Sequence, residues 1–113
     1  MCLIIFSYQP NSSTPLVVAA NRDEFFARPT AQADIWTDKS TEERVLAGRD
    51  LQAGGTWLGV TQSMRFAAVT NIRDPSQAEQ RPLTRGELTR GFLQGQESAE
   101  QYSYSLADSF DQY

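Results

Sequence analysis

Two apolar segments near the N-terminus, separated by a polar one, constrain the fold of this chain more than any other feature. Residues 3–6 and 16–20 carry only apolar side chains, whereas residues 9–15 (QPNSSTP) are rich in turn-forming types. Two short apolar runs joined in this way predict an antiparallel β-hairpin. Because neither run alternates with polar residues, we expect other layers to cover both faces of the hairpin.

The middle of the chain predicts further strands. Residues 45–47 indicate a short strand, and a glycine pair precedes a longer one over residues 56–61. A turn then leads into a strand over residues 65–70, which gives a second hairpin. Residues 30–44 are polar and mixed, and we predict no regular structure there. A polar loop with two prolines follows over residues 71–82.

Two capping patterns predict helices in the last third of the chain. Thr84-x-x-Glu87 opens a helix that extends to about residue 93, and Ser98-x-x-Gln101 opens a second one. Apolar side chains then recur at helical spacing at Ala99, Tyr102, Leu106, Phe110 and Tyr113. Strands followed by helices predict an α+β fold, and 113 residues are enough for one domain at most, residues 1–113.

Composition narrows the function classes. The net charge is −4 and no basic run is present, which disfavours nucleic-acid and anionic-membrane partners. No apolar run approaches the ~20 residues of a membrane span, and the N-terminus lacks signal-peptide features. With one cysteine and no histidine, we expect no disulfide, no metal site and no cofactor. A cytoplasmic protein with a small-molecule substrate or ligand is the expectation.

The predicted layers are too few for the predicted strands. Both hairpins need covering, but the sequence offers two helices, and the second one ends on its apolar stripe. We therefore expect either an incomplete portion of a larger fold or a homo-oligomer in which a second copy supplies the missing layer.

Cys2 is the first candidate for chemistry. Its small side chain favours removal of Met1, which would leave a free α-amine and a thiol on the same residue. That amine, with a pKa of about 7.7–8.0, can act as the base that a cysteine nucleophile needs, and no histidine competes for the role. The alternative is a small apolar residue at the start of a buried strand.

The tetrad Asn21-Arg22-Asp23-Glu24 follows the second strand. If the first two strands pair, Cys2 faces residues 21–23 across the hairpin. The Asp23 carboxylate can then hold the α-amine, and Arg22 can bind a substrate oxygen or fix Asp23 by a bidentate pair. The alternative is a charged loop with local ion pairs.

Two glycine segments and an asparagine complete the candidates. Gly48-Arg49-Asp50 and Gly54-Gly55-Thr56-Trp57 supply either tight turns or backbone N–H groups for an oxyanion, and the turn is the commoner case. The amide of Asn71, just past a strand, either donates to an oxyanion or forms an Asx turn.

Together these segments resemble the NRDE family, which includes the transport and Golgi organisation protein of animals and bacterial relatives. The matching features, in order, are Met1-Cys2, the tetrad, Arg28-Pro29, Gly48-Arg49-Asp50, Gly54 to Gly59 and Phe66 to Asn71. The resemblance covers nearly all of this chain but only the N-terminal part of the family's domain. It implies an Ntn-hydrolase-like αββα sandwich, of which this chain is a portion.

The resemblance also implies roles. Relatives of that fold with an N-terminal cysteine cleave non-peptide amides and carry an Arg-Asn-x-Asp segment. Here Asn21 and Asp23 fall into register, while the arginine is shifted to Arg22. We expect Cys2, Asp23 and Arg22 to be catalytic in hydrolysis of a linear amide through a thioester. The substrate-binding candidates are Asn21, Asn71, Arg49 and Trp57. The alternative is a non-catalytic carrier of an apolar ligand, a lipid or haem.

Overall fold

The predicted N-terminal hairpin forms. It consists of β1 (Leu3–Tyr8) and β2 (Leu16–Asn21), antiparallel, with Leu3 opposite Asn21. The structure, a computed structural model, describes residues 2–71 and 82–113. Met1 and most of the loop predicted over residues 71–82 therefore lie outside the described residues.

A four-stranded antiparallel sheet follows, in the order β3-β4-β5-β6. Its strands are β3 (Thr30–Thr37), β4 (Arg44–Asp50), β5 (Leu58–Thr61) and β6 (Phe66–Ala68). The β5–β6 hairpin confirms the second predicted hairpin, but β3 lies where no regular structure was predicted, and that prediction was wrong. β3 is an edge strand with a register shift between Ala31 and Asp34, and most of its side chains are exposed, so it carries no apolar alternation.

Two helices end the chain, α1 (Arg85–Gln94) and α2 (Ala99–Leu106), followed by a 3₁₀ turn at Phe110–Gln112. Ser98 forms the predicted capping box with Gln101. Thr84 precedes α1 without a side-chain capping bond, so that part of the prediction was wrong. α2 also ends earlier than the apolar spacing predicted, because short-range bonds such as Ser109 N–H to the Leu106 carbonyl tighten the chain.

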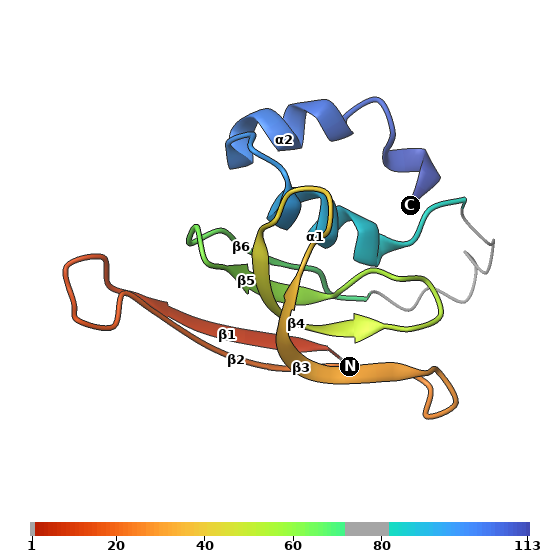
Figure 1. The fold of residues 1–113 in the computed structure, drawn as a ribbon, viewed down its shortest axis with the longest axis horizontal. Coiled ribbons are helices and arrows are strands. Elements are labelled where there is room, and N and C mark those ends of the chain that lie inside the picture. Colours follow the sequence, from red (N-terminus) through yellow and green to blue (C-terminus); the bar gives the residue numbers. More distant parts are fainter. Residues whose placement is uncertain (1, 72–81) are drawn as a thin grey trace.

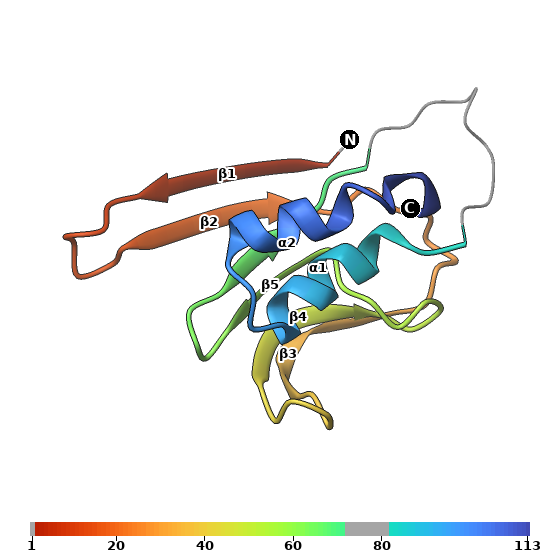
Figure 2. The ribbon, with the colours of Figure 1, turned by 90° about the horizontal axis from the view of Figure 1, so that it is seen from above.

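The core lies between α1 and one face of the four-stranded sheet. Its buried apolar residues are Val45, Ala47 and Leu93, with Trp36 and Ala67 packed against them. Gly59 lets the helix approach, since a Cβ there would lie 2.8 Å from Leu93 Cδ1. Figure 1 shows the helices above β5 and β6 and the β1–β2 hairpin below these two strands. In Figure 2 the tip of the hairpin extends beyond the rest of the molecule.

The hairpin is not covered on both faces, contrary to the prediction. Leu3, Ile5 and Phe6 are 54%, 61% and 66% exposed. The α+β class is confirmed, with one helical layer, one four-stranded sheet and one two-stranded sheet among the described residues. A second helical layer, which an αββα sandwich needs, is not among them, and the Ntn-hydrolase-like assignment stays a prediction. Within residues 2–71 and 82–113, no helix has the length and apolar character of a membrane span.

Candidate functional site

The hairpin register places Cys2 beside Asp23. With Leu3 opposite Asn21, the preceding residue reaches the backbone that follows β2. The N–H of Asp23 donates to Cys2 Sγ at 3.4 Å, and the thiol lies 4.0 Å from the Asp23 carbonyl oxygen. The Leu3 N–H donates to Asn21 Oδ1 at 3.1 Å, which holds the two strand ends together. The juxtaposition of Cys2 with residues 21–23 is the one that the hairpin predicted.

Backbone amides lower the pKa of the Cys2 thiol. The largest effect comes from a hydrogen bond with the Asn71 backbone, followed by the one with Asp23, and both favour the thiolate. Burial and the negative charge of Asp23 oppose them, but the net direction is downward. These hydrogen bonds favour the thiolate, which is the nucleophilic form of the half-buried Cys2.

Cys2 lies on the wall of a cavity of about 120 Å³. The cavity brings together six of the seven residues that the sequence selected, namely Cys2, Asn21, Arg22, Asp23, Trp57 and Asn71. Others on its wall were not selected, among them Glu24, Arg28, Asp50, Thr84, Arg85 and Gly86. A cavity of this volume has room for several water molecules or for part of a ligand.

Arg22 is fixed on the cavity wall. Its guanidinium carbon lies 4.1 Å from the centre of the Trp57 ring, and Nη2 pairs with Glu24 Oε2 at 3.2 Å. The stacking restricts the guanidinium to one plane. Because a guanidinium carries five N–H donors, the Glu24 bond leaves donors for a carbonyl or carboxylate in the cavity.

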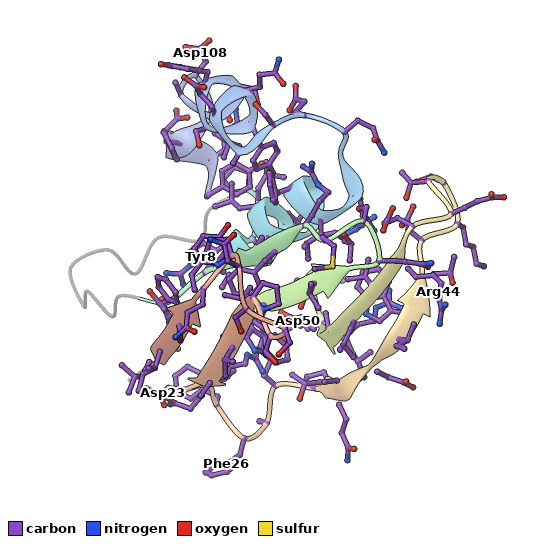
Figure 3. The ribbon with its side chains drawn as sticks, turned by 90° about the vertical axis from the view of Figure 1, so that its left-hand side faces the viewer. Tyr8, Asp23, Phe26, Arg44, Asp50 and Asp108 are labelled. Carbon is purple, nitrogen blue, oxygen red and sulfur yellow. The ribbon has the colours of Figure 1, made fainter. Side chains whose placement is uncertain are left out.

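A second arginine ion pair, Arg28 with Asp50, also lies on the cavity wall. Arg28 donates from Nη2 and Nε to Asp50 Oδ2 at 2.6 and 2.9 Å, and Asp50 Oδ1 accepts the N–H groups of Gln52 and Ala53. Burial alone would raise the pKa of Asp50, but Arg28 and the two amides bring it below its usual range. Asp50 in turn raises the pKa of Arg28. In Figure 3, Asp50 lies within the body, whereas Phe26, in the intervening loop, projects away from it.

Arg49 is the candidate that the structure does not bring to the cavity. Its guanidinium carbon lies 5.0 Å from the centre of the Trp36 ring. Sequence motifs contained Arg28 and Asp50, but no spacing indicated that they pair.

The glycine pair forms a turn. Gly54 has φ 81°, and its N–H donates to the Asp50 carbonyl at 2.8 Å. The N–H of Thr56 donates to the Gly86 carbonyl at 3.2 Å, so it is already engaged. A Cβ on Gly55 would lie 2.6 Å from the Gly86 backbone. The glycines therefore admit the first turn of α1 to the cavity wall, and the turn interpretation is the better supported one.

Comparison with known proteins adds a family. The sequence profile described as "Transport and Golgi organisation 2" matches residues 1–113. The mouse "Transport and Golgi organization 2 homolog" is 41% identical over 100 residues, which is 82% of this chain and 35% of that protein. The human "Transport and Golgi organization protein 2 homolog" is 39% identical over the same shares, and the Drosophila melanogaster protein is 40% identical over 75 residues. The chain thus spans about a third of the length of the mammalian relatives it matches.

Proposed function

The chain belongs to the Transport and Golgi organisation 2 family, whose name gives a cellular process and no reaction, and we propose that its site hydrolyses an amide bond of a small molecule. In this proposal the protein is Ntn-hydrolase-like and Cys2 is its nucleophile. The observation that carries it is the thiol on the cavity wall, with backbone N–H groups of Asp23 and Asn71 directed at the sulfur.

The chemistry begins with removal of Met1, which gives Cys2 an α-amine. The Cys2 thiolate attacks the amide carbonyl carbon, and the carbon–nitrogen bond breaks. The leaving amine takes the proton that the α-amine received from the thiol. Water, deprotonated by the same α-amine, then attacks the thioester and releases a carboxylic acid and the free thiol. A terminal amine suits this role because its pKa of about 7.7–8.0 is close to neutral pH.

The other residues bind and orient the substrate. Asp23 orients the α-amine, and Arg22 and Asn21 contact the substrate from the end of β2. The side-chain amide of Asn71 donates to the oxygen that becomes negative in the transition state. Arg49 has no part in this step, since it lies outside the cavity. A cytoplasmic location is part of the same proposal.

The first test separates the thiol from its base. Intact mass should show a chain without Met1, and iodoacetamide should alkylate Cys2 with an apparent pKa below the ~8.5 of a free thiol. A variant with one alanine inserted between Met1 and Cys2 keeps the thiol and displaces the amine. It should lose amide turnover while still being alkylated. A retained Met1 in the active protein would contradict the proposal.

The second test looks for the intermediate. Incubation with a panel of small N-acyl amides and quenching in acid should show an acyl adduct on Cys2 by mass spectrometry. Cys2→Ser should form the adduct far more slowly, and Cys2→Ala should not form it. Turnover that persists in Cys2→Ala would rule out this nucleophile.

A second candidate function is the non-catalytic carrier of an apolar ligand, a lipid or haem. It is favoured by a groove of about 520 Å³ between β1, β6 and the two helices, lined mostly by apolar side chains such as Phe6, Phe66 and Phe92. Saturable binding of a fatty acid or haem that is unchanged in Cys2→Ala, without amide turnover, would favour the carrier over the hydrolase.

A further inference from the structure

The described charged residues on the wall of the Cys2 cavity divide equally by sign. The carboxylates are Asp23, Glu24 and Asp50, and the guanidiniums are Arg22, Arg28 and Arg85. Two of the guanidiniums are paired, Arg28 with Asp50 at 2.6 Å and Arg22 with Glu24 at 3.2 Å. In the proposed function, the third carboxylate orients the α-amine of Cys2. The third guanidinium, that of Arg85, is therefore the charge without a counterpart on this wall.

Arg85 makes no ion pair with any other residue that the structure describes. It is an exposed residue and the first one of α1, where the helix dipole disfavours a cation. The stability of α1 therefore does not account for an arginine at this position. Because the positive end of the dipole and the guanidinium act together, this part of the cavity wall attracts anions.

Arg22 offers hydrogen-bond donors to the same cavity. Its side chain is 19% exposed, and its single hydrogen bond within the described part of the chain runs from Nη2 to Glu24. Nε and Nη1 make none there, although stacking on Trp57 holds the guanidinium in one plane. A planar guanidinium with free N–H groups matches the two oxygens of a carboxylate.

We propose that Arg22 and Arg85 bind a carboxylate in this cavity, and that the amides hydrolysed there carry a carboxylate close to the scissile bond. The inference rests on the proposed function, which places the amide at the Cys2 thiol. Both guanidiniums line the same cavity of about 120 Å³ as the thiol, so amide and carboxylate lie within a few bonds of each other. A protein side chain that supplied the anion would fill this space and exclude the substrate. N-acyl amino acids and half-amides of dicarboxylic acids have the required arrangement.

The first test needs no turnover. Iodoacetate and iodoacetamide both alkylate the one cysteine of the chain and differ by a negative charge, so the ratio of their rates reports the potential at the thiol. That ratio should exceed the ratio for free cysteine by about threefold or more, although the net charge of −4 repels an anion. Arg85→Gln should lower it by a similar factor. Arg90→Gln, the control, removes the same charge from α1 away from the cavity and should leave the ratio unchanged.

A ratio no higher than that of free cysteine would overturn the carboxylate site. Equal losses in Arg85→Gln and Arg90→Gln would also overturn it, because they would reflect net charge alone.

The second test uses matched amides. N-acetylglycine and N-methylsuccinamate carry the carboxylate on the amine part and on the acyl part, and N-acetylglycinamide and N-methylsuccinamide are their uncharged counterparts. Binding is measured as protection of Cys2 from iodoacetamide, and hydrolysis is measured separately. In at least one pair the acidic amide should protect at a concentration about tenfold lower than its counterpart, and that pair identifies the side that carries the carboxylate.

The two measurements separate this inference from the proposed function. Acidic amides that protect Cys2 without being hydrolysed would support the carboxylate site and contradict the hydrolase. Uncharged amides that protect and are hydrolysed as well as the acidic ones would support the hydrolase and overturn the carboxylate site.

Discussion

At the scale of single residues, the site is organised by backbone amides and by one stacked arginine, Arg22. The amides of Asp23 and Asn71 act on the Cys2 sulfur, and they follow β2 and β6, strands of two different sheets. Backbone donors cannot rotate away, so the thiol is held as firmly as the strands that carry them. Arg22 is held in a comparable way by the Trp57 ring and Glu24. The lowered pKa of Cys2 therefore depends on the backbone that follows β2 and β6 more than on any one charged side chain.

The position of the Trp57 ring can be tested by substituting Gly48, which lies next to it. A Cβ on Gly48 would lie 2.7 Å from Trp57 Cη2, so Gly48→Ala must displace the ring and should cost about 1–3 kcal/mol of unfolding free energy. In a Trp36→Phe background, the fluorescence maximum of Trp57 should shift. Gly54→Ala is the control, because its cost of about 1 kcal/mol comes from φ 81° and it has open space around it. An unshifted spectrum in Gly48→Ala would contradict the contact.

The Arg28–Asp50 pair predicts a pH dependence of stability. The pKa of Asp50 is lower in the folded protein than in the unfolded chain, so its contribution is present above about pH 4 and is lost as the pH falls through the folded pKa. Asp50→Asn should lower the unfolding free energy by about 2 kcal/mol at pH 7. The difference in unfolding free energy between Asp50→Asn and the wild type should be smaller at pH 3 than at pH 7.

Urea unfolding of both proteins at the two pH values measures this gap. Asp38, whose pKa is lowered to about 2 chiefly by the Ser40 hydroxyl, titrates in both proteins and so cancels in the difference. A gap that stays constant from pH 7 to pH 3 would show that the Asp50 charge does not stabilise the fold.

At the scale of elements, Tyr102 attaches α2 to α1. Tyr102 donates to the Leu88 carbonyl at 2.9 Å, and its ring packs against Phe92 with centroids 5.5 Å apart. No residue of α2 is buried. Gly91 lies beneath the tyrosine, since a Cβ there would be 2.6 Å from the Tyr102 hydroxyl oxygen. A glycine that weakens α1 intrinsically is thus the residue that admits α2.

This arrangement predicts that Gly91→Ala changes the unfolding free energy in opposite directions in two backgrounds. Gly91→Ala should destabilise the wild type by about 1–3 kcal/mol, because the new methyl group meets the tyrosine hydroxyl. In a Tyr102→Phe background the same substitution should stabilise the protein by about 0.5–1 kcal/mol, the usual gain of alanine over glycine in a helix. Thermal unfolding of the wild type, the two single variants and the double variant gives the coupling energy between the two positions. Equal effects in both backgrounds would mean that α2 moves away from the new methyl group without a cost in free energy.

Elements with strong local signals could be predicted from the sequence, and elements defined by a partner could not. The β1–β2 hairpin follows from two apolar runs, and the cap of α2 follows from Ser98 and Gln101. β3 could not be found, because an exposed edge strand with a register shift has no apolar periodicity. Thr84 had the right spacing to cap α1, but its side chain makes no capping bond.

The same distinction holds within the site. Cys2, Asn21 and Asp23 could be grouped from the sequence, because one hairpin brings them together. The contribution of Thr84, Arg85 and Gly86 could not, since it depends on the contact of Gly55 with the first turn of α1. Arg28 and Asp50 pair only because the loop after β2 returns to the end of β4.

At the scale of the whole molecule, the fold has one well-packed interface and one open side. Val45, Ala47 and Leu93 fill the space between the sheet and α1, whereas Ile35 and Leu46 are 53% and 47% exposed. The matched relatives are about three times as long as the region they share with this chain. The face of the sheet opposite α1 therefore leaves apolar side chains exposed among the described residues.

The exposed apolar surface of the open side predicts a weak dependence of the unfolding free energy on urea concentration. The folded chain exposes 8388 Å², about 2,200 Å² more than the ~6,200 Å² expected of a compact monomer of 12.6 kDa. Since the unfolded chain exposes about 18,000 Å², this excess reduces the area exposed on unfolding by about a fifth. Because the urea m-value scales with that area, it should be about a fifth lower than for a compact domain of equal length measured alongside. An m-value typical of a compact domain in the monomer would show that the open side closes in solution.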